Sequence, residues 1–100
     1  MKLGLFGVNY GTCGDPEAAI LVVQHAEAAG LESVWTGEHF VLPNPSRAGF
    51  SIAPTTPFLD SIVALTFLAA NTTRITLASG ILELPLHHPV ALAKQLASVD

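Results

Sequence analysis

The stretch Val-Trp-Thr-Gly-Glu-His-Phe, residues 34–40, contains the change of pattern that decides the fold. Its first half is an apolar, β-prone run, which predicts a buried strand over residues 33–36. Gly37 ends that run, and two ionisable side chains, Glu38 and His39, follow at once. Charged groups at the end of a buried strand raise the question of what they do there.

The sequence on either side alternates between strand-like and helix-like patterns. Residues 3–8 and 75–82 are further short apolar runs bounded by turn residues, so we expect strands there. Helical patterns cover residues 16–29, residues 58 or 60 to 70, and residues 90–98. The predicted order is therefore β-α-β-α-β-α.

Local chemistry supports these assignments. Asp15 can accept the first unbonded N–H groups of a helix, Pro16 suits the first helical position, and Glu17 complements the helix dipole. Gly30 is the residue type that commonly ends a helix. The second helix is apolar nearly all round, so we expect it to be buried, and we place Trp35 in the core.

Strands that alternate with helices imply a parallel sheet joined by right-handed crossovers. Two α/β architectures use this unit: an open doubly wound sheet and a (β/α)8 barrel. In a barrel, the chain would cover about the first three β-α units. Residues 41–57 would then be a loop insertion, since loops longer than ~12 to 15 residues are uncommon and are usually functional or disordered.

Composition excludes several classes. Half of the 100 residues are hydrophobic and only 12% are charged, against a usual ~25%, so the chain can form a core and is not disordered. It is more apolar than a free-standing small domain should be, which suggests part of a larger protein or an obligate assembly. The net charge of −4 and four scattered Lys and Arg residues argue against nucleic acid as a partner.

Further features bear on location. Cys13 is the only cysteine, so no intrachain disulfide can form, which fits a reducing cytosol. The longest apolar run, residues 62–70, is far short of the ~20 residues that span a bilayer. We therefore expect a cytoplasmic protein with no membrane partner.

In both architectures, ligands bind at the carboxyl ends of the strands. Glu38 and His39 follow the second strand, Asn9 and Tyr10 follow the first, and residues 79–83 follow the third, so these groups should converge. Histidine is well matched to proton transfer near neutral pH, and a neighbouring carboxylate could fix its ring. The alternative is that Glu38 and His39 are polar residues that open a solvated loop.

Weaker patterns leave other interpretations open. The small residues 78–80 indicate either close approach of a flat ligand or a packing constraint. Residues 11–14 resemble a dinucleotide-binding turn but lack G-x-G-x-x-G, and Asp15 would place negative charge where a pyrophosphate sits. Glu38 stands where Rossmann-type nucleotide-binding domains hold a ribose-binding acid, so that alternative stays open.

We expect no metal site in this chain. His87 and His88 are adjacent, which points their side chains apart, and no cluster of cysteines or carboxylates completes a ligand set. We interpret both histidines as turn residues before Pro89.

Three motifs give a more specific indication. Val-Trp-Thr-Gly-Glu-His-Phe follows Ala-Glu-Ala-Ala-Gly-Leu-Glu-Ser, and the segments Thr-Arg-Ile-Thr-Leu-Ala-Ser-Gly-Ile-Leu-Glu-Leu-Pro and His-His-Pro-Val-Ala-Leu-Ala-Lys-Gln come later. Together they resemble the bacterial luciferase-like monooxygenase family, most of all its coenzyme F420-dependent oxidoreductase branch. The resemblance implies a TIM barrel, of which residues 1–100 are the amino-terminal part, binding coenzyme F420, or alternatively FMN, at the strand ends.

The resemblance also implies roles for particular residues. Glu38 and His39 would lie beside the reactive ring, with His39 as proton donor or acceptor and Glu38 biasing its protonation. A non-prolyl cis peptide between Gly80 and Ile81 would back the ring, at a cost of about 3 to 4 kcal/mol. The catalytic residues expected are Glu38 and His39, and the expected cofactor contacts are Glu38, His39, Ser79, Gly80, Ile81 and Glu83.

The activity implied is that of an oxidoreductase. It would transfer hydride between coenzyme F420, or a reduced flavin, and a small organic substrate, or act as a monooxygenase. We expect the full-length protein to form a homodimer. An alternative is a non-catalytic fragment or partner subunit of the same fold that associates through its exposed sheet edge.

Overall fold

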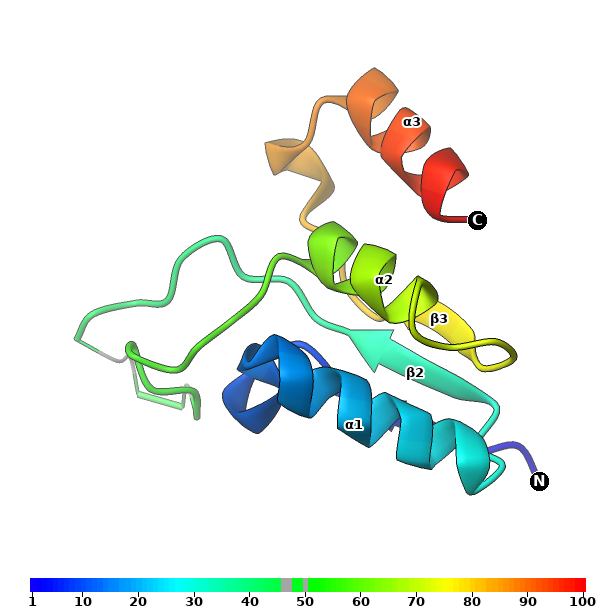
Figure 1. The fold of residues 1–100 in the computed structure, drawn as a ribbon. Helices are drawn as coiled ribbons and strands as arrows, with labels where there is room; N and C mark the ends of the chain where they lie inside the picture. The colour runs from blue at the N-terminus through cyan, green and yellow to red at the C-terminus, as the bar shows by residue number, and fades with distance from the viewer. Residues whose placement is uncertain (46–47, 50) are drawn as a thin grey trace.

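The computed structural model, which describes residues 1–45, 48–49 and 51–100, contains one sheet of three parallel strands (Figure 1). The strands are β1, Gly4–Phe6, β2, Ser33–Thr36, and β3, Thr76–Ser79. β2 lies in the centre and pairs in parallel with both neighbours. Because the strands are parallel, their three carboxyl ends share one edge of the sheet.

Helices follow each strand, as the sequence predicts. The helices are α1, Pro16–Ala28, α2, Ser61–Ala69, and α3, Pro89–Val99; two 3-10 turns are η1, Gly11–Gly14, and η2, Leu84–Leu86. The long connection between β2 and α2 extends from the carboxyl edge of the sheet (Figure 1). It contains the predicted loop insertion, of which residues 46, 47 and 50 lie outside the described residues.

Two aspartates begin two of the helices. The Asp15 carboxylate accepts a hydrogen bond from the backbone N–H of Ala18 at 2.9 Å, which confirms the predicted start of α1. Asp60 does the same for α2 through the N–H of Val63 at 2.9 Å. Gly30 follows α1 with φ +83°, in the left-handed region that glycine tolerates.

The core lies between the sheet and the helices α1 and α2. Val34, in the middle of β2, is fully buried between β1 and β3, where it pairs with Leu5 and Leu77. Figure 1 shows both helices on the same side of the sheet. The buried cluster comprises Val8, Cys13, Ala19, Val23, Ala26, Val34, Leu68 and Ile75.

Two predictions about burial are wrong. Trp35 is 38% exposed, because strand side chains alternate and Val34 and Thr36 occupy the face that the helices cover. Val63 of α2 is 60% exposed, because α2 buries only the face that meets the sheet and its neighbouring helices. Uniform apolarity along a helix therefore did not mean burial all round.

The strands β1 and β3 are shorter than their apolar runs. β3 ends at Ser79, whose hydroxyl donates to the carbonyl of Ile81 at 2.7 Å and so turns the chain. β1 ends at Phe6, while the central strand β2 has the predicted bounds. Among the described residues, none of the helices is long and apolar enough to cross a bilayer.

Candidate functional site

A buried amide ties the carboxyl ends of β1 and β2 together. Asn9 is fully buried, and its Nδ2 donates to the carbonyls of Gly37 at 2.8 Å and Leu59 at 2.9 Å. The N–H of Gly37 donates in return to Asn9 Oδ1 at 3.1 Å. Since Gly37 immediately precedes Glu38 and His39, these three bonds fix where both side chains leave the sheet.

The Glu38 side chain is buried, and both of its carboxylate oxygens have hydrogen-bond partners. Its residue is only 4% exposed, and both carboxylate oxygens lie 3.0 Å from Nε2 of His87. Its Oε2 also accepts the backbone N–H of Glu83 at 2.6 Å. A buried carboxylate is costly unless it is paired and hydrogen-bonded, and His87 and the Glu83 N–H satisfy that need.

This pairing corrects one prediction and gives Glu38 a partner that the sequence did not suggest, His87. His87 is not a plain turn residue, since its ring lies against Glu38 and, at 5.4 Å between centroids, beside Phe40. A signal was available in the sequence: a carboxylate at a buried strand end needs a donor, and a chain with four Lys and Arg residues leaves the histidines as candidates.

His39 faces a different carboxylate. Its Nδ1 lies 3.8 Å from Oε1 of Glu83, with the two side chains 30% and 34% exposed. The ring of Phe58 meets the imidazole edge-on, at 5.4 Å between centroids. The strand ends thus hold two crossed carboxylate–imidazole pairs, Glu38 with His87 and Glu83 with His39.

Two cavities share this edge of the sheet, and both are lined by Glu38, His39 and Phe58. The larger has a volume of about 220 Å³ and also includes Phe40 and Asp60. The smaller has a volume of about 110 Å³, whereas complete ligand pockets measure roughly 300 to 1,000 Å³. Each of the two cavities is therefore smaller than a complete ligand pocket. The other residues of the smaller cavity are Phe6, Tyr10, Gly37, Ile52 and Ile81.

Aromatic rings line much of the smaller cavity. Tyr10 stacks on Phe58 at 4.9 Å between centroids with an interplanar angle of 11°. Phe6 meets Tyr10 edge-on at 6.4 Å. The sequence placed Tyr10 at the strand ends but gave no sign of Phe58, which is brought in by the loop returning to α2.

The third strand end meets the expectations only in part. Ile81 lines the smaller cavity together with His39. Gly80 makes the predicted close approach, but to Phe6: a Cβ on Gly80 would lie 2.7 Å from Phe6 Cε2. Ser79 instead lines a separate cavity between β3 and α3, so the structure does not bring it to the site.

The predicted cis peptide between Gly80 and Ile81 is wrong. Among the described residues the cis peptide bond is the prolyl one between Asn44 and Pro45. A non-prolyl cis bond persists only where the surroundings enforce it. Here the backbone continues from Gly80, whose N–H donates to the carbonyl of Thr36 at 2.8 Å, in the ordinary trans form.

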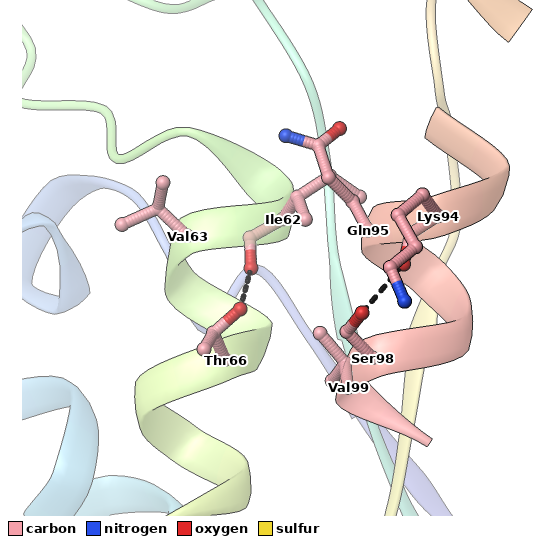
Figure 2. Close-up of a pocket in the computed structure, with 7 residues that line it drawn as sticks. All are labelled: Ile62, Val63, Thr66, Lys94, Gln95, Ser98 and Val99. Carbon is pink, nitrogen blue, oxygen red and sulfur yellow. Dashed lines mark hydrogen bonds between the residues drawn. The ribbon is translucent and has the colours of Figure 1, made fainter. Parts of the chain in front are cut away.

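Two other parts of the structure, the pocket between α2 and α3 and the start of α1, show fewer features of a catalytic site. A pocket of about 270 Å³ between α2 and α3 shares no residue with the strand-end cavities, and the hydroxyls of Thr66 and Ser98 on its wall bond to carbonyls of their own helices (Figure 2). At the start of α1, the Asp15 carboxylate occupies the helix end where a pyrophosphate would bind, so the nucleotide-binding alternative gains no support. Within the described residues no group of three or more His, Cys, Asp or Glu could hold a metal ion.

A parallel β-α unit with histidines, carboxylates and an aromatic cavity at its strand ends is a ligand-binding α/β arrangement. The profile of the family described as Luciferase-like monooxygenase matches residues 3–100. The chain therefore belongs to the luciferase-like monooxygenase family, and the predicted family is confirmed. The coenzyme F420 branch stays a prediction.

One relative is the flavin-dependent trigonelline monooxygenase, oxygenase component, of Acinetobacter baylyi. It is 35% identical to this chain over 81 residues, which cover 81% of this chain and 19% of that protein. The chain thus spans about a fifth of the length of this relative.

Proposed function

We propose that this chain forms the amino-terminal wall of the active site of a flavin-dependent monooxygenase that acts on a small organic molecule. The observation that carries the proposal is the position of His39. Its imidazole lines both strand-end cavities and faces Glu83 and Phe58. Family membership and a flavin-dependent monooxygenase among the relatives support the cofactor and the reaction.

The fold context is a (β/α)8 barrel, with residues 1–100 as the first three β-α units of one domain. Three parallel strands in sequential order support this, because each crossover places the next strand beside the last. The greater length of the relative supports it as well. Further strands would then enlarge the strand-end cavities toward the size of a complete ligand pocket.

The residues present fit a planar, largely apolar ring. The smaller cavity is lined by Phe6, Tyr10, Phe58 and Ile81, and Gly37 beside them carries no side chain. His39 adds a polar group to this wall. An apolar pocket with few convergent polar groups is the usual form of a small-molecule site.

Each named residue has a distinct task. When bound, a reduced flavin supplies the electrons for reducing O₂ as one oxygen atom enters the substrate. His39 holds or moves a proton beside the ring, a role for which imidazole is suited near neutral pH. The aromatic side chains of Tyr10 and Phe58 exclude water from the reacting groups.

Coenzyme F420 is the second candidate cofactor, with hydride transfer to or from a small substrate as the reaction. The segments Gly-Glu-His-Phe-Val-Leu-Pro-Asn-Pro and Ile-Leu-Glu-Leu-Pro-Leu-His-His-Pro favour it by resemblance. Titration of the full-length protein with FMN, reduced FMN and coenzyme F420 separates the two. We expect the flavin to bind more tightly, and tighter binding of coenzyme F420 would reverse the choice.

Mutation of His39 tests the reaction. His39→Ala should lower turnover about 100-fold or more, the usual effect of losing a general acid or base, while flavin affinity changes little. His25→Gln is the matched control, because His25 is exposed on α1 and its Nδ1 lies 2.7 Å from the carbonyl of Leu21 in its own helix. Unchanged turnover in His39→Ala would remove His39 from the mechanism.

The full-length protein is also expected to be a homodimer. Exposed apolar side chains on α2 and α3, namely Val63, Val90 and Leu96, support an assembly that covers them. Sedimentation analysis of the full-length protein measures this, and a monomer at micromolar concentration would contradict it. A partner subunit without catalysis, the other alternative, would bind neither flavin nor coenzyme F420.

A further inference from the structure

Three carboxylates lie around His39, and the structure assigns them different tasks. Glu38 and Asp60 line the larger cavity together with His39, and Glu83 faces the imidazole from the segment after β3. If His39 carries a proton as proposed above, one of these carboxylates sets which ring nitrogen holds it. This inference rests on that proposed function.

Two of the three carboxylates, Glu38 and Asp60, have other hydrogen-bond partners. Both oxygens of Glu38 face His87 Nε2, and one of them also accepts the Glu83 N–H. Asp60 accepts the N–H of Val63 and so caps α2. Glu38 cannot turn toward His39 without leaving a buried charge unpaired, and Asp60 Oδ1 is held at the start of α2.

Glu83 remains, and its geometry is suitable. Its Oε1 lies 3.8 Å from Nδ1 of His39, longer than a hydrogen bond but within ion-pair range. Hydrogen bonds of catalytic groups are often long without ligand and tighten in the complex. We propose that Glu83 is the positioning residue of His39: it keeps the proton on Nδ1, so that Nε2 is the nitrogen that accepts a proton during the reaction.

The crossed pairing explains how Glu83 is held in place. Its backbone N–H donates to Glu38 at 2.6 Å, and its carbonyl accepts the N–H of Leu86 at 2.8 Å in the turn that leads to His87. His87 returns to the same Glu38 carboxylate. Glu38 and His87 therefore support the backbone of Glu83.

The chemistry follows from charge. A carboxylate beside Nδ1 favours the Nδ1–H tautomer and fixes the plane of the ring. When Nε2 takes a proton from a substrate group or water, the resulting imidazolium gains a negative partner at Oε1 of Glu83. Glu83→Gln removes that charge while preserving most of the side-chain shape.

The test measures the tautomer directly. Ring ¹⁵N resonances of the full-length, cofactor-free protein labelled in histidine would be recorded at a pH where imidazole is neutral, with His39→Asn to identify the signals of His39. We expect Nδ1–H in the native protein and a shift toward Nε2–H in Glu83→Gln. Glu17→Gln removes one exposed carboxylate from the first turn of α1 and should leave the tautomer as it is.

The turnover of the variants is the second measurement that tests the role of Glu83. Glu83→Gln should lower kcat at least about 10-fold and at most about 10⁴-fold, the loss seen when a catalytic histidine takes the wrong tautomer, with KM and flavin affinity little changed. His25→Gln, on the exposed surface of α1, is the control and should behave as the native protein does. Glu83→Gln with native tautomer populations, or native His39 with its proton on Nε2, would overturn the inference.

These results separate the inference from the function on which it rests. Failure of the native protein to bind any flavin or coenzyme F420 would refute the proposed function, whatever the tautomer. Normal flavin binding and turnover with an unchanged tautomer in Glu83→Gln would refute only the role of Glu83. The two outcomes come from different samples and cannot be confused.

Discussion

Replacement of Asn9 by alanine tests whether the site depends on the buried amide between β1 and β2. The side chain makes three hydrogen bonds, two to the carbonyls of Gly37 and Leu59 and one from the Gly37 N–H. Each contributes about 1 kcal/mol net, so the variant should lose about 3 kcal/mol of unfolding free energy. That is a large part of the total, since a typical protein is stable by only about 5 to 15 kcal/mol.

Urea denaturation of the full-length protein measures this loss. Asn71→Ala is the matched control, because Asn71 is exposed just after α2 and its Nδ2 donates to the carbonyl of Phe67 at the end of that helix. The control should change the stability by less than about 0.5 kcal/mol, as surface substitutions usually do. An Asn9→Ala variant as stable as the control would refute the claim that this amide holds the strand ends together.

Two further changes test the packing around the sheet. The pKa of Glu27 is lowered from its ordinary value of 4.5, because backbone N–H groups of residues 73–75 donate to its carboxylate. The ionised Glu27 therefore stabilises the fold above pH 4.5, and this stabilisation is lost as the pH falls through the lower pKa of the folded state. The advantage of native protein over Glu27→Gln in urea should therefore shrink below pH 4.5; an advantage independent of pH would be the contrary result. Gly80→Ala places a Cβ 2.7 Å from Phe6 and should cost about 1 to 3 kcal/mol, a loss that a second change, Phe6→Ala, should partly relieve; two losses that simply add would show that the contact is not the cause.

Local chemistry was sufficient to predict the elements. Asp15 and Pro16 set the start of α1, and the apolar run before Gly37 gave the bounds of β2. Parallel order then followed from alternation, and with it the convergence of Glu38, His39 and Ile81 on one edge. These features depend on neighbours in the chain or on simple topology, which a single sequence carries.

The partners of the charged groups could not be predicted in the same way. Glu38 and His87 are 49 residues apart, and nothing local connects them. Whether Trp35 points to the helices or away from them depends on which face the sheet buries, which the strand alone does not specify. The approach of Gly80 to Phe6 and its bond to Thr36 likewise involve residues from other strands.

A crystal structure of the full-length protein with FMN bound tests the central claim most directly. The flavin ring should lie at the carboxyl ends of the strands, in contact with His39 and Ile81 and against the aromatic wall of Tyr10 and Phe58. A ring bound elsewhere, for example in the pocket between α2 and α3 (Figure 2), would contradict the placement of the active site at this edge of the sheet.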